Sequence, residues 1–343
     1  MATLNFFKHI EIDIFSATPK YIQLAQSVIK AIGEGWLKEN DVLPSINELS
    51  HEFDVSRDTA EKAYKYLKNI GVLGSVPGKG YFVTDHEVKS SIRVFLLFNK
   101  LSTHKKIIYD SFVKTLGNEA AIDFYIYNND FSIFKKLIEK ADKSHTHFVI
   151  IAHFLDRNEK AFEILNTIPK EKLILLDKLV PGVDGDFSAV YEDFEVDIYT
   201  VLEKALEPLK KYEKLGIILP EKTYVPKEIV EGFKKFCSQY AFAAEILHDI
   251  KTKELETGVA YICLIEDDLV ALVERISITK LIIGKNIGVI SYNETPLKRI
   301  ILKGITTIST DFEQMGKEAA QLVLTGEKKQ VAIPFHLKLR PSL

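Results

Sequence analysis

Apolar and polar positions alternate with helical spacing in the first seventy residues. Residues 21–37 carry apolar side chains on one face of a predicted helix, and residues 45–69 hold two shorter helical patterns in succession. Ser45 with Glu48 has the spacing of a capping box, and a second capped start follows at Ser56. After Gly71, residues 72–83 predict two short strands around a glycine-containing turn. This order of elements is typical of a winged helix-turn-helix.

The periodicity changes after residue 92, where apolar runs of strand length alternate with helical patterns. The predicted strands are 93–98, 122–127, 148–152, 173–176, 189–191, 215–219, 261–265 and 287–291. The predicted helices are 103–116, 131–142, 157–167, 194–211, 226–239, 267–279 and 311–325. Strands that alternate with helices predict parallel sheets covered on both faces, and this number of them predicts two packed lobes.

These patterns predict three segments: a winged helix-turn-helix at 1–84, a polar linker at 85–91 and a bilobal α/β domain at 92–343. The length of 343 residues suits more than one core, and 46% apolar with 27% charged residues is typical of a globular protein. The net charge of −3 gives no bulk attraction to nucleic acid. Residues 55–82, however, carry five basic against two acidic side chains, which favours a local contact with DNA.

The first segment resembles the GntR family of winged-helix regulators through Leu43-Pro44-Ser45, Val55-Ser56-Arg57-Asp58-Thr59 and Gly78-Lys79-Gly80-Tyr81-Phe82-Val83. The resemblance implies that Arg57 and Thr59 enter the major groove, where an arginine can read guanine. The predicted DNA-binding residues are Ser45, Asn47, Ser56, Arg57, Asp58, Thr59, Lys62, Gly78, Lys79 and Gly80. Many members of the family have arginine at the positions of Asn47 and Glu61, so the operator is expected to differ. A protein-interaction module is the alternative interpretation of such a helical unit.

The later residues resemble the LacI/GalR effector domain and periplasmic sugar-binding proteins through 267–272, 287–294 and 305–308. The combination with a GntR-type head is similar to arabinose- and fucose-responsive regulators. Ligands of parallel sheets bind beyond the carboxyl ends of the strands. Together these points predict an effector site made of Asn99, Ser102, Asn129, His153, Asp177, Tyr191, Asp193, Tyr224, Lys227, Asp267, Asn293 and Phe312.

Two departures from this second resemblance concern the effector site. Asp267 stands where the family usually has asparagine, and Asn293 where it usually has aspartate, so carboxylate and amide are exchanged. Ile229 replaces the arginine that commonly clamps the sugar, and Lys227 or Tyr224 is the candidate to substitute for it.

Few residues suggest other chemistry. Cys237 and Cys263 are predicted core residues, and His145 with His147 is predicted to lie on the surface because no third metal ligand is near in sequence. The sequence has no nucleophile elbow and no P-loop, so no cofactor, no metal and no enzymatic activity are expected. No apolar run reaches about 18 residues, which predicts a cytoplasmic protein without membrane contact.

The sequence therefore predicts a homodimeric repressor of a carbohydrate-utilisation operon. It would bind a pseudo-palindromic double-stranded operator and be released by a small sugar, a pentose or deoxyhexose with or without a phosphate, bound between the lobes. Two alternatives stay open: a sugar-processing enzyme with a DNA-binding head, and a regulator controlled by a protein partner without a small effector.

Overall fold

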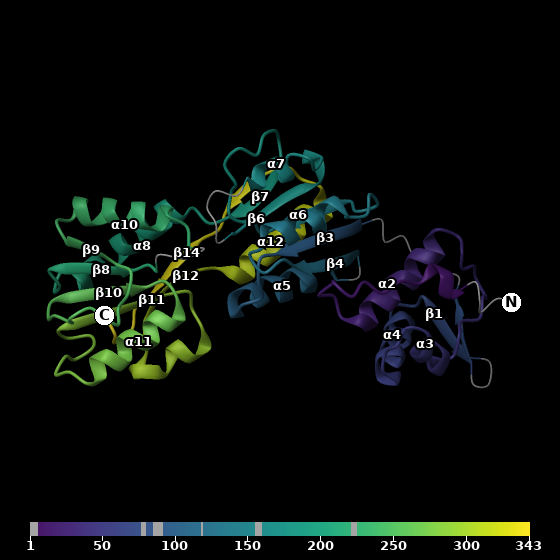
Figure 1. Cartoon of the computed structure of the whole chain (residues 1–343), viewed down its shortest axis with the longest axis horizontal. Coiled ribbons are helices and arrows are strands. Elements are labelled where there is room, and N and C mark those ends of the chain that lie inside the picture. The colour runs from purple at the N-terminus through teal and green to yellow at the C-terminus, as the bar shows by residue number, and fades with distance from the viewer. Residues whose placement is uncertain (1–5, 77–79, 85–91, 118, 155–159, 221–224) are drawn as a thin grey trace.

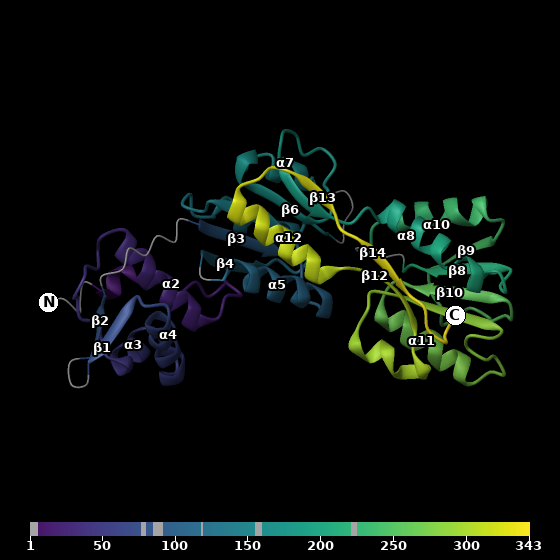
Figure 2. The ribbon, with the colours of Figure 1, turned by 180° about the vertical axis from the view of Figure 1, so that it is seen from behind.

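The computed structural model describes residues 6–76, 80–84, 92–117, 119–154, 160–220 and 225–343. Figure 1 and Figure 2 show three bodies in a row: an N-terminal head, a middle lobe and a far lobe that contains the C-terminus. The predicted linker at 85–91 and the tip of the predicted wing at 77–79 lie outside the described residues. Within the described ranges, no helix has both the length and the apolar character that crossing a bilayer requires.

The head has the predicted winged helix-turn-helix order. Its elements are η1 (Phe7–His9), α2 (Lys20–Gly33), α3 (Ile46–Glu52), α4 (Arg57–Asn69) and the antiparallel strands β1 (Leu73–Val76) and β2 (Gly80–Val83). Their apolar faces meet in one core that includes Leu24, Leu49, Tyr64 and Leu67. The first helix ends at Gly33 and not at residue 37 as predicted, because Gly35 takes a positive φ of 78° and Trp36 turns outward, 54% exposed.

The middle lobe is a six-stranded sheet in the order β13-β7-β6-β5-β3-β4. The strands are β3 (Ile92–Phe98), β4 (Ala120–Ile126), β5 (His147–Ile150), β6 (Leu173–Asp177), β7 (Ser188–Tyr191) and β13 (Gln330–Ala332), all paired in parallel. The helices are α5 (Thr103–Leu116), α6 (Phe131–Glu139), α7 (Ala161–Leu165), η2 (Lys170–Lys172) and α12 (Phe312–Thr325). One buried cluster joins the sheet to α5 and α12, and another joins it to α6 and α7, so both faces are covered.

The far lobe repeats this plan with the order β14-β12-β11-β10-β8-β9. Its strands are β8 (Lys214–Ile218), β9 (Ala243–Leu247), β10 (Val259–Cys263), β11 (Ile287–Tyr292), β12 (Thr306–Thr310) and the antiparallel β14 (Phe335–Lys338). Its helices are α8 (Phe194–Lys204), α9 (Leu206–Leu209), α10 (Glu228–Gln239), α11 (Glu266–Ser277), η3 (Pro296–Arg299) and η4 (Ile301–Lys303). The chain crosses between the lobes after β7, after β12 and after β13. The last two crossings are the yellow C-terminal segments in Figure 1 and Figure 2.

The eight predicted strands and most predicted helices are present, with four strands added. The added strands are β9, β12, β13 and β14. Predicted helix 194–211 is broken into α8 and α9, and helix 131–142 ends at Glu139. Cys237 and Cys263 are buried as predicted. The surface prediction for His145 is wrong: it is 2% exposed, because its Nε2 lies 2.7 Å from the Asp123 carboxylate.

The head is attached to the middle lobe by hydrogen bonds to the free edge of β4. The Ala17 amide donates to the Phe124 carbonyl at 2.6 Å, and the Thr18 hydroxyl accepts from the Phe124 amide at 2.8 Å. The Gln26 amide group donates to the Ile122 carbonyl at 3.2 Å. An otherwise open sheet edge is thus covered by the segment that leads into α2.

Candidate functional site

The helix-turn-helix of the head is held by local caps and by one long-range bond. The Ser45 side chain and Glu48 form the predicted capping box at α3, and Ser56 accepts from the Thr59 amide at 3.1 Å to start α4. The buried Tyr64 hydroxyl donates to the Pro44 carbonyl at 2.8 Å, which sets α4 against the start of α3. Both helix starts are therefore fixed in position.

The predicted DNA-binding residues lie mainly on the exposed side of these two helix starts. Those exposed are Ser45, Asn47, Ser56, Arg57, Asp58, Lys62 and Gly80, while Thr59 is half-buried. Gly78 and Lys79 lie outside the described residues. Lys62 forms an exposed ion pair with Asp58 at 2.7 Å within α4, so part of its charge is balanced inside the helix.

A shallow groove on the head places further cations beside α4. Lys20 at the start of α2 lines it together with Lys62 and Lys65. The prediction did not include Lys20, because α2 is distant in sequence from the recognition helix. Only the packing of α2 beside α4 brings its basic end to this face.

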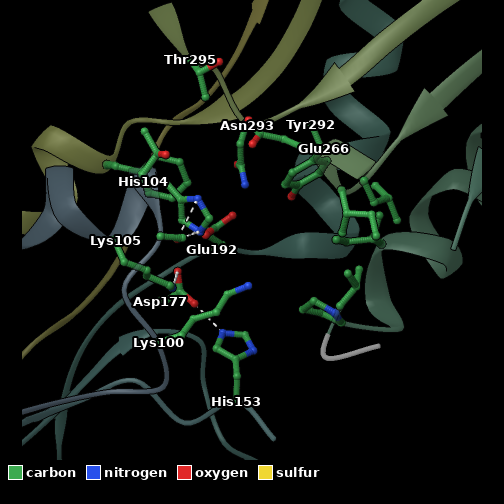
Figure 3. Close-up of a pocket in the computed structure, with 18 of the residues that line it drawn as sticks. Lys100, His104, Lys105, His153, Asp177, Glu192, Glu266, Tyr292, Asn293 and Thr295 are labelled. Atoms are coloured by element: carbon green, nitrogen blue, oxygen red, sulfur yellow. Dashed lines mark hydrogen bonds and ion pairs between the residues drawn. The ribbon is translucent and has the colours of Figure 1, made fainter. Parts of the chain in front are cut away.

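A cleft of about 420 Å³ lies between the middle and far lobes. Its walls come from the segments that follow β3, β5, β6 and β7 in one lobe and β8, β10 and β11 in the other. These are the carboxyl ends of parallel strands, where ligands of doubly wound sheets bind. Figure 3 shows side chains from both lobes pointing into the space between them.

A buried ionic cluster forms one side of the cleft. The Lys105 ammonium lies 2.7 Å from one Asp177 carboxylate oxygen, and His153 contacts the other. All three side chains are buried. Despite the cost of burial, the Lys105 ammonium and His153 lower the pKa of Asp177, and burial lowers the pKa of His153. The cluster is therefore an ionised aspartate held between a lysine and a neutral histidine.

Glu192 completes this cluster at a crossover between the lobes. It follows β7, and its side chain bonds to Thr310 at the end of β12, with Oε2 and Oγ1 separated by 2.6 Å. Burial and the neighbouring Asp177 charge raise the pKa of Glu192 well above its ordinary value. Its bond to Thr310 joins two of the three crossover segments.

Three buried polar atoms around the cleft have no hydrogen-bond partner among the described residues. They are the Oδ1 atoms of Asn99 and Asn293 and the hydroxyl of Tyr292. The Asn99 amide nitrogen is held by Asn129 Oδ1 at 2.7 Å, which leaves its oxygen available. Buried polar atoms normally have partners, so these atoms are available for hydrogen bonds to a polar ligand in the cleft.

The structure brings seven of the predicted effector residues into the lining of the cleft. These are Asn99, Ser102, His153, Asp177, Asp267, Asn293 and Phe312. Four others lie outside the described lining: Asn129 accepts from the Asn99 side chain, Asp193 caps α8, Tyr191 packs on the middle-lobe core, and Lys227 is the N-cap of α10. Tyr224 lies outside the described residues, so a substitute for the clamp arginine is not observed among those described.

Several lining residues were not predicted. His104 stacks on Phe312 with 5.0 Å between ring centres, and burial lowers the pKa of His104 to about 3. Lys298 donates to the Asn293 carbonyl at 2.8 Å and lies 3.5 Å from Glu266. Neither residue belongs to a motif, and Lys298 sits in η3, so only the fold places them in the cleft. No cluster of three or more metal-binding side chains occurs among the described residues.

The fold and the cleft define a class: a winged helix-turn-helix joined to a two-lobed periplasmic-binding-protein-like body. Residues 20–83 match the gntR family of bacterial regulatory proteins, and residues 210–343 match the periplasmic binding protein-like domain. The chain therefore carries a GntR-type DNA-binding domain and a periplasmic-binding-protein-like domain, as the sequence predicted.

Two curated relatives match the head. "HTH-type transcriptional repressor YtrA" of Bacillus subtilis is 34% identical over 77 residues, which cover 22% of this chain and 59% of the relative. "Arabinose metabolism transcriptional repressor" of Geobacillus stearothermophilus is 32% identical over 74 residues, which cover 22% of this chain and 20% of the relative. The matched segment thus spans less than two thirds of either relative.

Solved structures of similar fold cover most of the chain. The Lac repressor bound to ONPG in the repressed state has a TM-score of 0.62 at 14% identity, covering 84% of this chain and 92% of that one. The trehalose repressor from Escherichia coli has a TM-score of 0.56 at 14% identity, covering 72% of this chain and 100% of that one. At this identity the likeness establishes the fold of the body.

Proposed function

We propose that this chain is a cytoplasmic, sequence-specific transcriptional repressor of a carbohydrate-utilisation operon, and that a sugar bound between its lobes releases it from a pseudo-palindromic operator. The observation that carries the proposal is the pairing of an exposed, capped recognition helix with an interlobe cleft that has unpartnered buried polar atoms. The relatives that match the head are named as repressors. An enzyme with a DNA-binding head has no comparable support.

A homodimer is part of this proposal, because a pseudo-palindromic operator presents two half-sites. Large apolar side chains are exposed on and near α11 and in the η3 region, and they offer a surface for a second copy. They are Val270, Ile278, Ile282, Leu297 and Ile300. Sedimentation of the full chain and of Ile278→Asp would test this: dissociation is expected in the variant, and an unchanged dimer would exclude this surface.

The repressor proposal is tested by operator binding with and without pentoses, deoxyhexoses and their phosphates. A coupling free energy of about 1–3 kcal/mol would change operator affinity about 5- to 150-fold when the effective sugar is added. If a sugar binds the protein without altering operator affinity, the switch is wrong. If no small molecule binds and a protein partner releases the DNA, the partner-controlled regulator takes its place.

Arg57→Ala tests the DNA-reading part separately. The substitution should remove about 1–3 kcal/mol of preference for the operator over other duplexes, while sugar binding in the distant cleft stays unchanged. Lys65→Ala is the matched control on the same helix: it should weaken binding to all duplexes alike and reduce the dependence on salt. Retained operator preference in Arg57→Ala would remove Arg57 from base recognition.

A further inference from the structure

The two sides of the cleft differ in chemical character. The middle-lobe side presents the ionic cluster around Asp177 together with Asn99 and Ser102, and Figure 3 shows His153, Lys105 and Glu192 gathered there. On the far-lobe side, the part of the lining near the start of α10 is apolar. It is lined by Val225, Pro226, Ile229, Leu264 and Ile265. A ligand that contacts both sides must itself have a polar and an apolar part.

The apolar wall is the edge of the far-lobe core. Ile229 is 2% exposed and belongs to the same buried cluster as Val225 and Leu264. Its neighbour Phe194, at the start of α8, lines the cleft as well. Such side chains offer no hydrogen bonds, and covering a hydroxyl or a phosphate with them would carry a desolvation cost. The wall therefore favours a ligand that presents a carbon-rich group to α10.

The charged side chains that line the cleft leave no net positive charge, because Lys100, Lys105 and Lys298 stand against Asp177, Glu266 and Asp267. Lys105 is paired with Asp177 at 2.7 Å, and Lys298 with Glu266 at 3.5 Å. Burial and the Asp177 charge raise the pKa of Glu192, so this carboxyl group adds no positive charge either. An anion therefore meets no net positive charge in the cleft, and taking a partner away from one of the buried ion pairs would be costly. The balance favours a neutral ligand.

The unpartnered atoms show where the polar part of the ligand binds. The oxygens of Asn99 and Asn293 accept hydrogen bonds, and the Tyr292 hydroxyl donates or accepts one. They come from the middle lobe and the far lobe, so hydroxyl groups of one ring can bridge the two. We propose that the effector is an uncharged, hydroxylated ring that carries an apolar substituent, such as a methyl group, and that this substituent lies against Ile229, Val225 and Leu264.

This inference rests on the proposed sugar-responsive function and narrows its ligand class. The test measures binding to the full chain by calorimetry for matched sets: a hexose, its 6-deoxy counterpart, its methyl glycoside and its 6-phosphate. Within the set that binds, a methyl-bearing member should bind about tenfold more tightly than the parent hexose, since an apolar pocket discriminates a methyl or methylene group by about 10- to 200-fold. The 6-phosphate should bind more weakly than the parent.

Ile229→Thr and Ile229→Val form a matched pair of variants, because threonine and valine have nearly the same shape and differ in polarity. Ile229→Thr should bind the methyl-bearing ligand about tenfold more weakly than Ile229→Val, and both should bind the parent hexose alike. Thermal unfolding of both variants checks that each is folded. Equal affinity of the two variants for the methyl-bearing ligand would overturn the placement of the substituent.

The outcomes separate this inference from the function on which it rests. Tighter binding of the phosphate, or equal binding of the hexose and its methyl-bearing counterparts, would overturn the inference and leave a sugar-responsive repressor. If no member of any set binds, the sugar-responsive function itself is wrong, and this inference with it.

Discussion

At the scale of single residues, the cleft contains groups whose pKa values are set by their neighbours. Lys105 and His153 contact both oxygens of Asp177 and lower its pKa, while burial and the Asp177 charge raise the pKa of Glu192, at the end of the neighbouring strand. Two carboxyl groups whose pKa values are shifted in opposite directions thus lie in one cluster. This ionic cluster, which forms one side of the cleft, also makes the stability of the fold depend on pH.

The wild type should lose stability as the pH rises, because of Glu192, and Glu192→Gln should lose less. The folded-state pKa of Glu192 is raised, so above its unfolded pKa of about 4.3 the unfolded chain releases a proton that the folded protein retains. In that window the free energy of unfolding of the wild type falls with pH by up to about 1.4 kcal/mol per unit, and the glutamine variant lacks this contribution. The other groups are common to both proteins and cancel.

Urea unfolding of wild type and variant between pH 5 and pH 8 measures this difference. The variant should gain stability relative to the wild type as the pH rises, until the folded-state pKa is passed. Asp177 contributes in the opposite direction and only near and below its unfolded pKa of about 3.9, because its folded-state pKa is lowered. Parallel profiles across the range would mean that Glu192 is ionised in the folded protein.

At the scale of elements, close helix contacts hold the walls of the cleft in place. α10, which carries Ile229, packs on α8 through Gly232. A Cβ atom at Gly232 would overlap the backbone oxygen of Glu195 and the side chain of Ile198. The backbone of α8 cannot move aside as a flexible side chain can. The close packing of α10 on α8 therefore requires glycine at position 232.

Gly232→Ala should therefore lower the free energy of unfolding by about 1–3 kcal/mol, the usual cost of overpacking. Gly33→Ala, at the end of α2, is the matched control, because no atom lies within 4 Å of its added methyl group and its φ is not positive. That variant should be neutral or more stable by about 0.5–1 kcal/mol. Chemical unfolding measures the stability of both variants. If Gly232→Ala is as stable as Gly33→Ala, α10 can shift away from α8 without an energetic cost.

At the scale of the whole molecule, the head is coupled to the body by more than the linker. Thr18 is 5% exposed, and its hydroxyl accepts from the Phe124 amide and donates to the Ile122 carbonyl at 3.3 Å. Lys30 of α2 adds a contact of 3.5 Å to Asp142. These bonds hold the head on the middle lobe, so we expect a movement of that lobe to displace the head as well.

Thr18→Val should loosen this attachment, because the buried Phe124 amide loses its acceptor at a cost of about 1–3 kcal/mol. Hydrogen exchange at Phe124 is expected to be faster, and the effect of sugar on operator affinity smaller, with sugar binding itself unchanged. Ser27→Ala is the control, since Ser27 bonds to Glu11 within the head. Exchange at Phe124 equal to that of the wild type would show that the head does not depend on this contact.

The sequence alone determined the elements whose signals are local. The capping box at Ser45, the capped start at Ser56 and the apolar period of α4 predicted the head, because caps and helical faces depend on residues three or four apart. The eight predicted strands were recognisable as apolar runs. β12 was not, because its buried Thr306, Thr307 and Thr310 look polar in sequence.

The tertiary structure decided which sites and contacts form between segments that are distant in sequence. The cluster of Lys105, His153, Asp177 and Glu192 assembles from the first turn of α5 and the ends of three strands, and the bond between Thr18 and Phe124 spans more than a hundred residues. Burial and the protonation of each carboxyl group follow from this assembly. No periodicity encodes such contacts, because they depend on which strand ends lie side by side once the sheets have formed.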